Sequence, residues 1–81
     1  MLIEYKPDFL KTIKKIKDAT FKEKVKKKVE KIIENPEIGK PMRYNRKGTR
    51  ELYVEPYRLA YAFIPEEGKI IFLGIYHKDE Q

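Results

Sequence analysis

The stretch GTRELYVEPYRLAYAFIPEEGKIIFLGIYHK, residues 48–78, alternates apolar side chains with arginines and tyrosines. Such alternation, interrupted by turn-forming sequences, predicts three strands of an antiparallel sheet. The strands are expected at about residues 50–54, 57–64 and 69–76. The turns are Glu55-Pro56 and Pro65–Gly68, where the glycine can take a positive φ. The last segment, IIFLGIY, is apolar on both faces, so we expect it inside the sheet.

Two amphipathic helices are predicted before these strands. The first begins at Pro7-Asp8, after a short β-prone segment, LIEY. The apolar residues have helical spacing in both helices, and Asn35-Pro36 ends the second. These apolar residues are Phe9, Leu10, Ile13 and Ile16 in the first helix, and Phe21, Val25, Val29, Ile32 and Ile33 in the second. Asp18-Ala19-Thr20 separates the two helices and supplies cap-like side chains, and Thr20 with Glu23 matches a capping box. The lysine-rich outer face of the second helix is interpreted as solvated.

This order of elements predicts an α+β fold in a single domain, residues 1–81. In this fold an N-terminal strand and a helical hairpin pack on an antiparallel sheet of about four strands. A short edge strand is also expected around Met42–Tyr44. A chain of 81 residues is near the lower size limit for one core and buries roughly 60% of its unfolded surface.

A two-residue connection at Glu55-Pro56 predicts which side chains share a face of the sheet. One set should pack on the helices: Leu52, Val54, Leu59, Tyr61 and Phe63. The other set should face outward: Glu51, Tyr53, Arg58, Ala60 and Ala62. The small alanines are expected to leave a shallow depression beside Tyr53 and Arg58, where a base and a phosphate fit. His77 and Lys78 end the neighbouring strand, and Arg43 and Arg46 come from the connector.

The composition excludes several classes of site. The chain has no cysteine, no serine and one histidine, so thiol nucleophiles, disulfides, Cys-based zinc sites, Ser-His-Asp triads and two-histidine ribonuclease mechanisms are all excluded. No apolar run approaches 18 residues and no leader opens the chain, which predicts a cytoplasmic protein with no membrane partner. Abundant Lys and Glu with scarce Asn and Gln hint at a heat-loving source.

The net charge of +6 is unevenly distributed along the chain. Residues 40–58 carry six Lys and Arg against two Glu, and all four arginines of the chain lie within residues 43–58. The planar guanidinium suits phosphate recognition, whereas dispersed lysines more often serve solubility. A basic domain of this kind favours nucleic acid or an acidic protein as its partner.

Two runs, KPMRYNRKGTRELYVEPYRLAYAF and KIIFLGIYHK, resemble the RelE-type toxins of the RelE/ParE superfamily, as does IEYKPDFLKTIKKI near the N-terminus. The resemblance covers nearly the whole chain, and its most specific part is Tyr57-Arg58-Leu59-Ala60-Tyr61. It implies the toxin of a type II toxin–antitoxin pair, a ribosome-dependent mRNA endonuclease that cleaves in the A site through attack of the 2′-hydroxyl. It also implies three partners, a RelB-like antitoxin, the ribosome and mRNA, and neither a cofactor nor a metal.

The resemblance also assigns site residues. Arg58 is the arginine of the Tyr-Arg motif, Lys78 closes the last strand where a basic residue belongs, and His77 lies beside it. Two departures from the family are evident: Glu51 and Tyr53 stand where some members have lysines, and the tail KDEQ lacks the tyrosine that many members carry.

The chemistry of each residue leaves alternatives open. Arg58 is a poor base and is assigned to phosphate stabilisation, against a simple salt bridge to Glu51 or Glu55. Histidine is the side-chain type best suited to act as an acid or a base at neutral pH, so His77 is a candidate for that role, against an ordinary surface residue; Lys78 or Lys47 could also serve. Tyr53 could stack on a base, act as an acid or only pack. Arg43, Arg46, Lys47 and Arg50 are the candidate RNA-binding or ribosome-binding residues, and the first three could instead dock an acidic antitoxin segment.

Three functions therefore remain: the metal-independent endoribonuclease, a gyrase-inhibiting non-nuclease member of the superfamily, and an RNA-binding module without catalysis.

Overall fold

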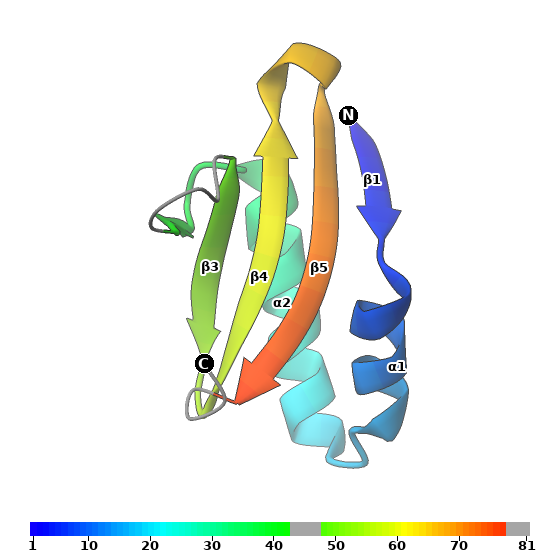
Figure 1. Ribbon diagram of the computed structural model, residues 1–81. Coiled ribbons are helices and arrows are strands. Elements are labelled where there is room, and N and C mark those ends of the chain that lie inside the picture. Colours follow the sequence, from blue (N-terminus) through cyan, green and yellow to red (C-terminus); the bar gives the residue numbers. More distant parts are fainter. Residues whose placement is uncertain (43–47, 78–81) are drawn as a thin grey trace.

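The computed structural model describes residues 1–42 and 48–77 as two helices and five strands (Figure 1). In chain order the elements are β1 (Leu2–Tyr5), α1 (Pro7–Lys15), α2 (Ala19–Glu34), β2 (Lys40–Pro41), β3 (Thr49–Val54), β4 (Tyr57–Ile64) and β5 (Lys69–His77). A single 3₁₀ turn, η1 (Pro65–Glu67), connects β4 to β5. The α+β class predicted from the sequence is confirmed.

The strands form one mixed sheet in the order β1-β5-β4-β3-β2. The three long strands are antiparallel, as predicted, and the apolar β5 lies inside the sheet. The structure differs in one respect: β1, which joins the sheet as its fifth strand, runs parallel to β5, so the sheet is mixed and not purely antiparallel. β1 covers the edge of β5 that β4 leaves open, so β5 pairs with a neighbouring strand on both of its edges. The edge strand β2 lies at Lys40–Pro41, just before the position expected from the sequence.

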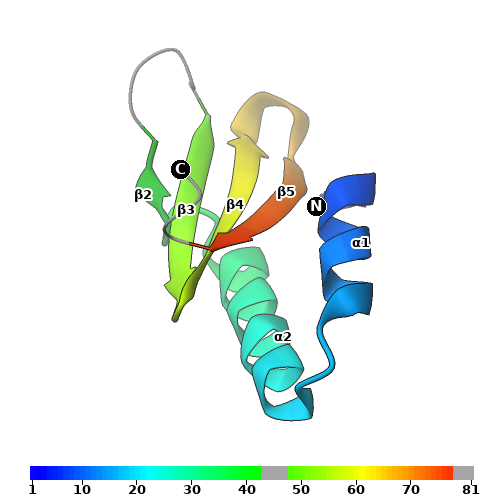
Figure 2. The same ribbon diagram turned by 60° about the horizontal axis from the view of Figure 1, so that its bottom comes forward.

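Both helices lie on the same side of the sheet, and no described element covers the other side (Figures 1 and 2). We call the uncovered side the outer face. Apolar side chains from the helices and from the inner side of the sheet form one core. Its buried members include Phe9, Val25, Ile32, Leu59, Tyr61, Ile70 and Phe72. The rings of Tyr5, Phe9 and Phe72 lie 5.2–5.7 Å from one another between centroids, which fixes β1 and α1 against β5.

Asp18 is the residue that caps α2. Its Oδ1 accepts hydrogen bonds from the backbone N–H groups of Thr20, at 2.9 Å, and Phe21, at 3.2 Å. The predicted capping box at Thr20 and Glu23 is therefore wrong by two residues, because an earlier carboxylate already satisfies the free N–H groups of the first turn. The cap ends the short connection between α1 and α2.

The predicted register of β3 and β4 is confirmed. Val54 lies opposite Tyr57, Tyr53 opposite Arg58 and Leu52 opposite Leu59. The two predicted sets of side chains accordingly lie on opposite faces, and Val54 and Leu59 on the inner face are buried. Gly68, at the second turn, has a φ of 58°, as that turn requires. In the part of the chain that the structure describes, no helix is long and apolar enough to cross a membrane.

Candidate functional site on the outer face

Arg58 lies near the start of β4, on the outer face, between side chains of β3 and β5. Its partner on β3 is Tyr53 and its partner on β5 is Tyr76, so a tyrosine stands on each side of it. Directly opposed residues in a sheet project to the same face with Cβ atoms about 4.5–5.5 Å apart. The register alone therefore places one cation between two aromatic side chains.

Two contacts with described residues of β3 help to hold the Arg58 side chain. The guanidinium carbon lies 5.0 Å from the centre of the Tyr53 ring, within the range of a cation–π interaction. Nη1 donates a hydrogen bond to Oε1 of Glu51 at 3.2 Å. The two side chains are 24% and 15% exposed, so this ion pair is partly desolvated and only weakly screened by salt. Arg58 is thus oriented along the sheet surface, with its charge offset by a carboxylate.

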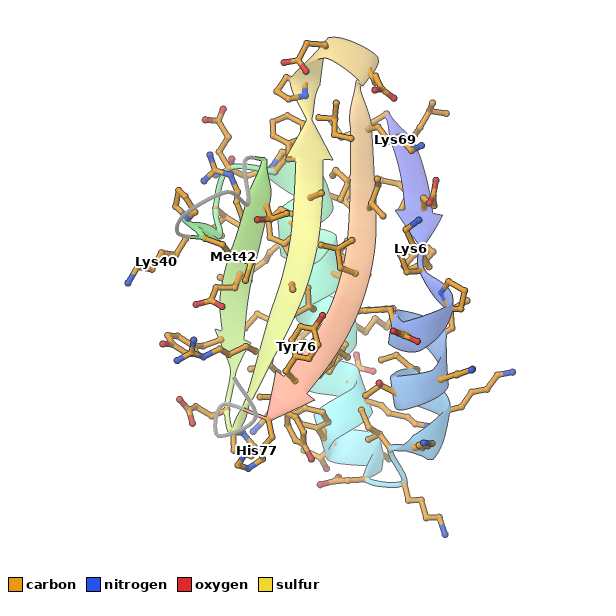
Figure 3. The ribbon with its side chains drawn as sticks, in the orientation of Figure 1. Lys6, Lys40, Met42, Lys69, Tyr76 and His77 are labelled. Atoms are coloured by element: carbon orange, nitrogen blue, oxygen red, sulfur yellow. The ribbon has the colours of Figure 1, made fainter. Side chains whose placement is uncertain are left out.

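Tyr76 lies across β5 on the outer face (Figure 3). A Cβ atom added to Gly74 would come within 2.9 Å of the Tyr76 hydroxyl oxygen, so the ring occupies the space that a side chain at position 74 would need. Ala60, opposite Gly74, is only 3% exposed. The depression predicted beside the alanines is therefore partly filled by Tyr76, a residue that the sequence analysis did not assign to the site.

His77 lies on the opposite face of the sheet from Arg58. Its partner across the sheet is Tyr57, whose own partner is the buried Val54. The rings of His77 and Tyr57 meet edge to face, with centroids 5.4 Å apart, and the Tyr57 ring packs in turn on Phe21 of α2 at 5.0 Å. The structure therefore does not bring His77 to the outer face with Arg58, and places it at the end of the sheet (Figure 3).

A one-residue irregularity in β5 is the reason for this placement. The register pairs Ala60 with Gly74 but Tyr61 with Phe72, so Leu73 is left out of the pairing. A bulge of this kind reverses the faces of all residues that follow it. Alternation that continued unbroken from Phe72 would have put His77 on the outer face and Tyr76 on the inner one.

Arg50 lies opposite Tyr61, and its guanidinium holds the connector that follows α2. Nη1 donates to the carbonyl oxygens of Gly39, at 2.8 Å, and Glu37, at 3.0 Å. The Tyr61 hydroxyl binds the same connector, donating to Pro36 O at 2.7 Å and accepting from Gly39 N at 2.8 Å. These contacts give Arg50 a structural role at the far end of β3 from Arg58, and its predicted RNA contact stays a prediction.

Burial raises the pKa of Tyr61 above its ordinary value of 10.0, while the Gly39 N–H and the Arg50 charge oppose that shift. The hydroxyl therefore remains protonated and available as a donor to Pro36 at neutral pH.

The remaining predicted residues, Arg43, Arg46, Lys47 and Lys78, lie outside the described residues, and their roles stay predictions. Among residues 1–42 and 48–77, no group of three His, Asp or Glu side chains is placed so that it could hold a metal ion.

A family model for the ParE toxin of the type II toxin–antitoxin system parDE matches residues 3–81, nearly the whole chain. The chain belongs to the ParE toxin family. The superfamily predicted from the sequence is thereby confirmed, and the protein is a toxin of a type II toxin–antitoxin system.

Solved structures similar to this toxin share its fold. The toxin in the intact RelBE toxin–antitoxin complex of E. coli matches with a TM-score of 0.79 and 22% identity, over 94% of each chain. The YoeB/ParE toxin from Agrobacterium tumefaciens matches with a TM-score of 0.82 and 13% identity, over 95% of this chain and 98% of that one. The RelBE2 complex of Mycobacterium tuberculosis gives 0.79 and 20%, over 95% and 96%. Comparison with curated protein sequences gave no match.

Proposed function

We propose that this toxin is a ribosome-dependent mRNA endonuclease that cleaves in the A site without a metal, with Arg58 as the residue that binds the scissile phosphate. The observation that carries the proposal is the placement of Arg58 on the outer face between Tyr53 and Tyr76. A guanidinium flanked by aromatic side chains combines a phosphate ligand with surfaces on which bases can stack. Action on ribosomes also places the toxin in the cytoplasm.

The proposed reaction is an internal transfer at the phosphate. The 2′-oxygen of the ribose attacks phosphorus, the bond from phosphorus to the 5′-oxygen breaks, and a 2′,3′-cyclic phosphate remains on the upstream fragment. A base takes the proton of the 2′-hydroxyl, and an acid gives one to the departing 5′-oxygen. N–H groups of Arg58 donate to the non-bridging oxygens, where negative charge increases in the transition state.

Tyr53 and His77, both candidate proton-transfer groups, lie on different faces of the sheet. Tyr53 is 52% exposed on the same face as Arg58, so its ring can stack on a base. His77 contacts Tyr57 on the other face, so a role for it requires the substrate to bend around the end of β5. We therefore assign Tyr53 to the substrate-binding surface and retain His77 and Lys78 as the candidate acid and base. Positioning by the ribosome supplies part of the rate enhancement.

Primer extension on a defined mRNA in a reconstituted translation reaction tests the proposal. The reaction is run with and without ribosomes and with the purified toxin. We expect cuts within the A-site codon only when ribosomes are present. Intact mRNA in the presence of folded toxin would contradict the nuclease assignment.

A second candidate function, gyrase inhibition without nuclease activity, is favoured by the Glu51–Arg58 ion pair. A carboxylate beside the arginine offsets the charge that would bind a phosphate, and this fits an arginine whose role is to stabilise the fold. If this candidate function is correct, the toxin inhibits supercoiling by purified gyrase and leaves the translation reaction unaffected. Salt-sensitive RNA binding with neither effect would indicate the third candidate, a non-catalytic RNA-binding module.

We further propose that an antitoxin encoded beside the toxin binds it through an apolar, partly acidic segment. Similar toxins occur in solved complexes with antitoxins, RelBE of E. coli and RelBE2 of M. tuberculosis. The outer face carries half-exposed aromatic side chains and the chain is basic, which suits a partner of that composition. Co-purification of the toxin with the product of its neighbouring gene is the expected result, and failure of the two purified proteins to associate would contradict it.

A further inference from the structure

A groove lined by lysines lies between α2 and the end of β3, where α2 passes behind the sheet (Figure 1). Its volume is about 360 Å³, and side chains from the helix, from the end of β3 and from the turn after β3 line it. We call it the lysine groove. The lysines that line it are Lys24, Lys27, Lys28 and Lys31. At 1.5 Å per residue they extend over about 10 Å of the helix axis.

The lysine groove has a large excess of positive charge. None of the three glutamates of α2 lines it, and the one carboxylate in its lining is that of Glu55, in the turn after β3. Within residues 1–42 and 48–77, the structure gives none of the four lysines an ion pair. A concave surface with cations of one sign concentrates anions from solution. The groove therefore suits an extended polyanion.

Tyr53 lines the lysine groove and also belongs to the outer face. Its ring is 52% exposed and lies opposite Arg58. β2 pairs with β3 only at Arg50 and Glu51, so among the described residues no strand lies beside the edge of β3 at Tyr53. A chain bound on the outer face can therefore pass over Tyr53 into the groove without crossing another strand.

We propose that the lysine groove binds the sugar-phosphate backbone of a single-stranded RNA that has one of its bases stacked on Tyr53. A cationic groove for the backbone beside an aromatic ring for a base is the usual composition of a site for single strands. Lysine, a flexible point charge, suits phosphate contacts that do not depend on sequence. The inference rests on the proposed function, because it takes the outer face as the side that binds mRNA, and it extends the bound mRNA beyond the cleaved bond.

An acidic protein segment is the other polyanion that such a groove could bind. Protein interfaces have a core of buried apolar side chains, and these carry most of the binding energy. The apolar residues that line the lysine groove are Tyr53 and Val54, and Val54 is only 3% exposed. The lining thus offers a partner one aromatic ring and four ammonium groups, which favours RNA.

Fluorescence anisotropy at low salt, with labelled single-stranded RNAs of about four and about twelve nucleotides, tests this inference on the purified full-length toxin. The double variant Lys27→Gln/Lys31→Gln removes two exposed charges from the groove. It should bind the longer RNA about tenfold more weakly than the wild type, and the slope of log K against log salt should fall by about 1.4, the value for two lost phosphate contacts. Binding of the shorter RNA should stay within about twofold, because a base on Tyr53 leaves little backbone to reach these lysines.

The matched control is Lys22→Gln/Lys26→Gln. These lysines are exposed on the same helix at the same spacing, and they do not line the groove. With 3.6 residues per turn, each lies about half a turn around the helix from Lys24. The control should bind both RNAs within about twofold of the wild type. Equal losses in the two double variants would show an effect of net charge alone and would overturn the inference.

Two further variants keep the test decisive. Lys24→Gln/Lys28→Gln, from the same groove, replaces the first pair if circular dichroism shows that the first pair is unfolded, and the same result is expected. Tyr53→Ala should weaken binding of both RNAs, because one strand occupies the ring and the groove. If it weakens neither, the strand does not pass over Tyr53 and the inference is wrong. Loss of antitoxin binding with unchanged RNA binding in the groove variants would assign the groove to an acidic protein segment instead.

The ribosomal cleavage reaction separates failure of this inference from failure of the proposed function. If the wild-type toxin cuts mRNA in the A site but the groove pair and the control pair bind RNA equally, the inference alone is wrong. If the two pairs differ as predicted but the wild-type toxin leaves mRNA intact on ribosomes, the nuclease assignment alone is wrong, and the lysine groove remains a site for single-stranded RNA.

Discussion

Tyr53 and Arg58 lie opposite each other on β3 and β4, with the guanidinium carbon 5.0 Å from the centre of the tyrosine ring. The contact holds a phosphate ligand next to a half-exposed ring that a base can cover. The aromatic surface, and not the hydroxyl, is the feature that this arrangement requires for RNA binding.

We predict that Tyr53→Ala weakens single-stranded RNA binding by about 1–3 kcal/mol, the range of one lost base–aromatic stacking interaction. Tyr53→Phe keeps the ring and should bind like the wild type. Fluorescence anisotropy measures both variants. Equal losses in Tyr53→Phe and Tyr53→Ala would show that the hydroxyl makes the important contact.

Tyr61→Phe should lower the free energy of unfolding by about 1–3 kcal/mol. The substitution removes the hydroxyl that donates to Pro36 O and accepts from Gly39 N, and it leaves two backbone groups without these partners. Urea unfolding of wild type and variant measures the difference. Tyr5→Phe, in a half-exposed ring elsewhere in the chain, is the matched control and should change the stability little. A Tyr61→Phe variant as stable as the wild type would contradict the role assigned to this hydroxyl.

The raised pKa of Tyr61 predicts a loss of stability at alkaline pH. Above about pH 10.0 the unfolded state releases the Tyr61 proton while the folded state retains it, so the unfolded state binds fewer protons and the free energy of unfolding falls as the pH rises. Below that pH the contribution is fully present. The quantity to measure is the difference in slope between wild type and Tyr61→Phe from pH 9 to 11, because contributions that the two proteins share cancel in the difference. Identical slopes would contradict this prediction.

Asp18→Ala should destabilise the toxin by about 1 kcal/mol, because the first turn of α2 loses the acceptor of two backbone N–H groups. Asp18→Asn retains an acceptor oxygen and should lose much less. Thermal unfolding followed by circular dichroism compares the two. If Thr20→Ala were the more damaging substitution, the cap would be at Thr20 after all.

The sequence allowed the faces of β3 and β4 to be predicted because the connection between them has two residues. Once Tyr53 is set opposite Arg58, strict alternation determines every other side chain of the hairpin. The same alternation places Arg50 on the inner face with Leu52 and Val54, so the sequence already contained the signal that separates Arg50 from Arg58.

The positions of His77 and Tyr76 could not be predicted in the same way. They depend on the register of β5, and the unpaired Leu73 changes that register within the strand. A glycine inside a strand often accompanies a bulge, and Gly74 is the one local signal that was available. The direction of β1 could not be predicted either, because four residues with an ordinary strand pattern do not indicate whether the strand pairs parallel or antiparallel with its neighbour.

The cleavage rate of stalled ribosomal complexes, measured under single-turnover conditions, tests the role of Arg58 most directly. Wild type, Arg58→Ala, Arg58→Lys and Lys11→Ala are compared; Lys11 lies on the exposed side of α1 and serves as the control for charge. We predict that Arg58→Ala slows cleavage by about 10²–10³-fold, as expected when one hydrogen-bond donor that stabilises a transition state is removed. Arg58→Lys should cleave only slightly faster than Arg58→Ala, because lysine lacks the planar fork of donors. Lys11→Ala should cleave at the wild-type rate. Cleavage by folded Arg58→Ala at the wild-type rate would contradict the role of Arg58 as the ligand of the scissile phosphate.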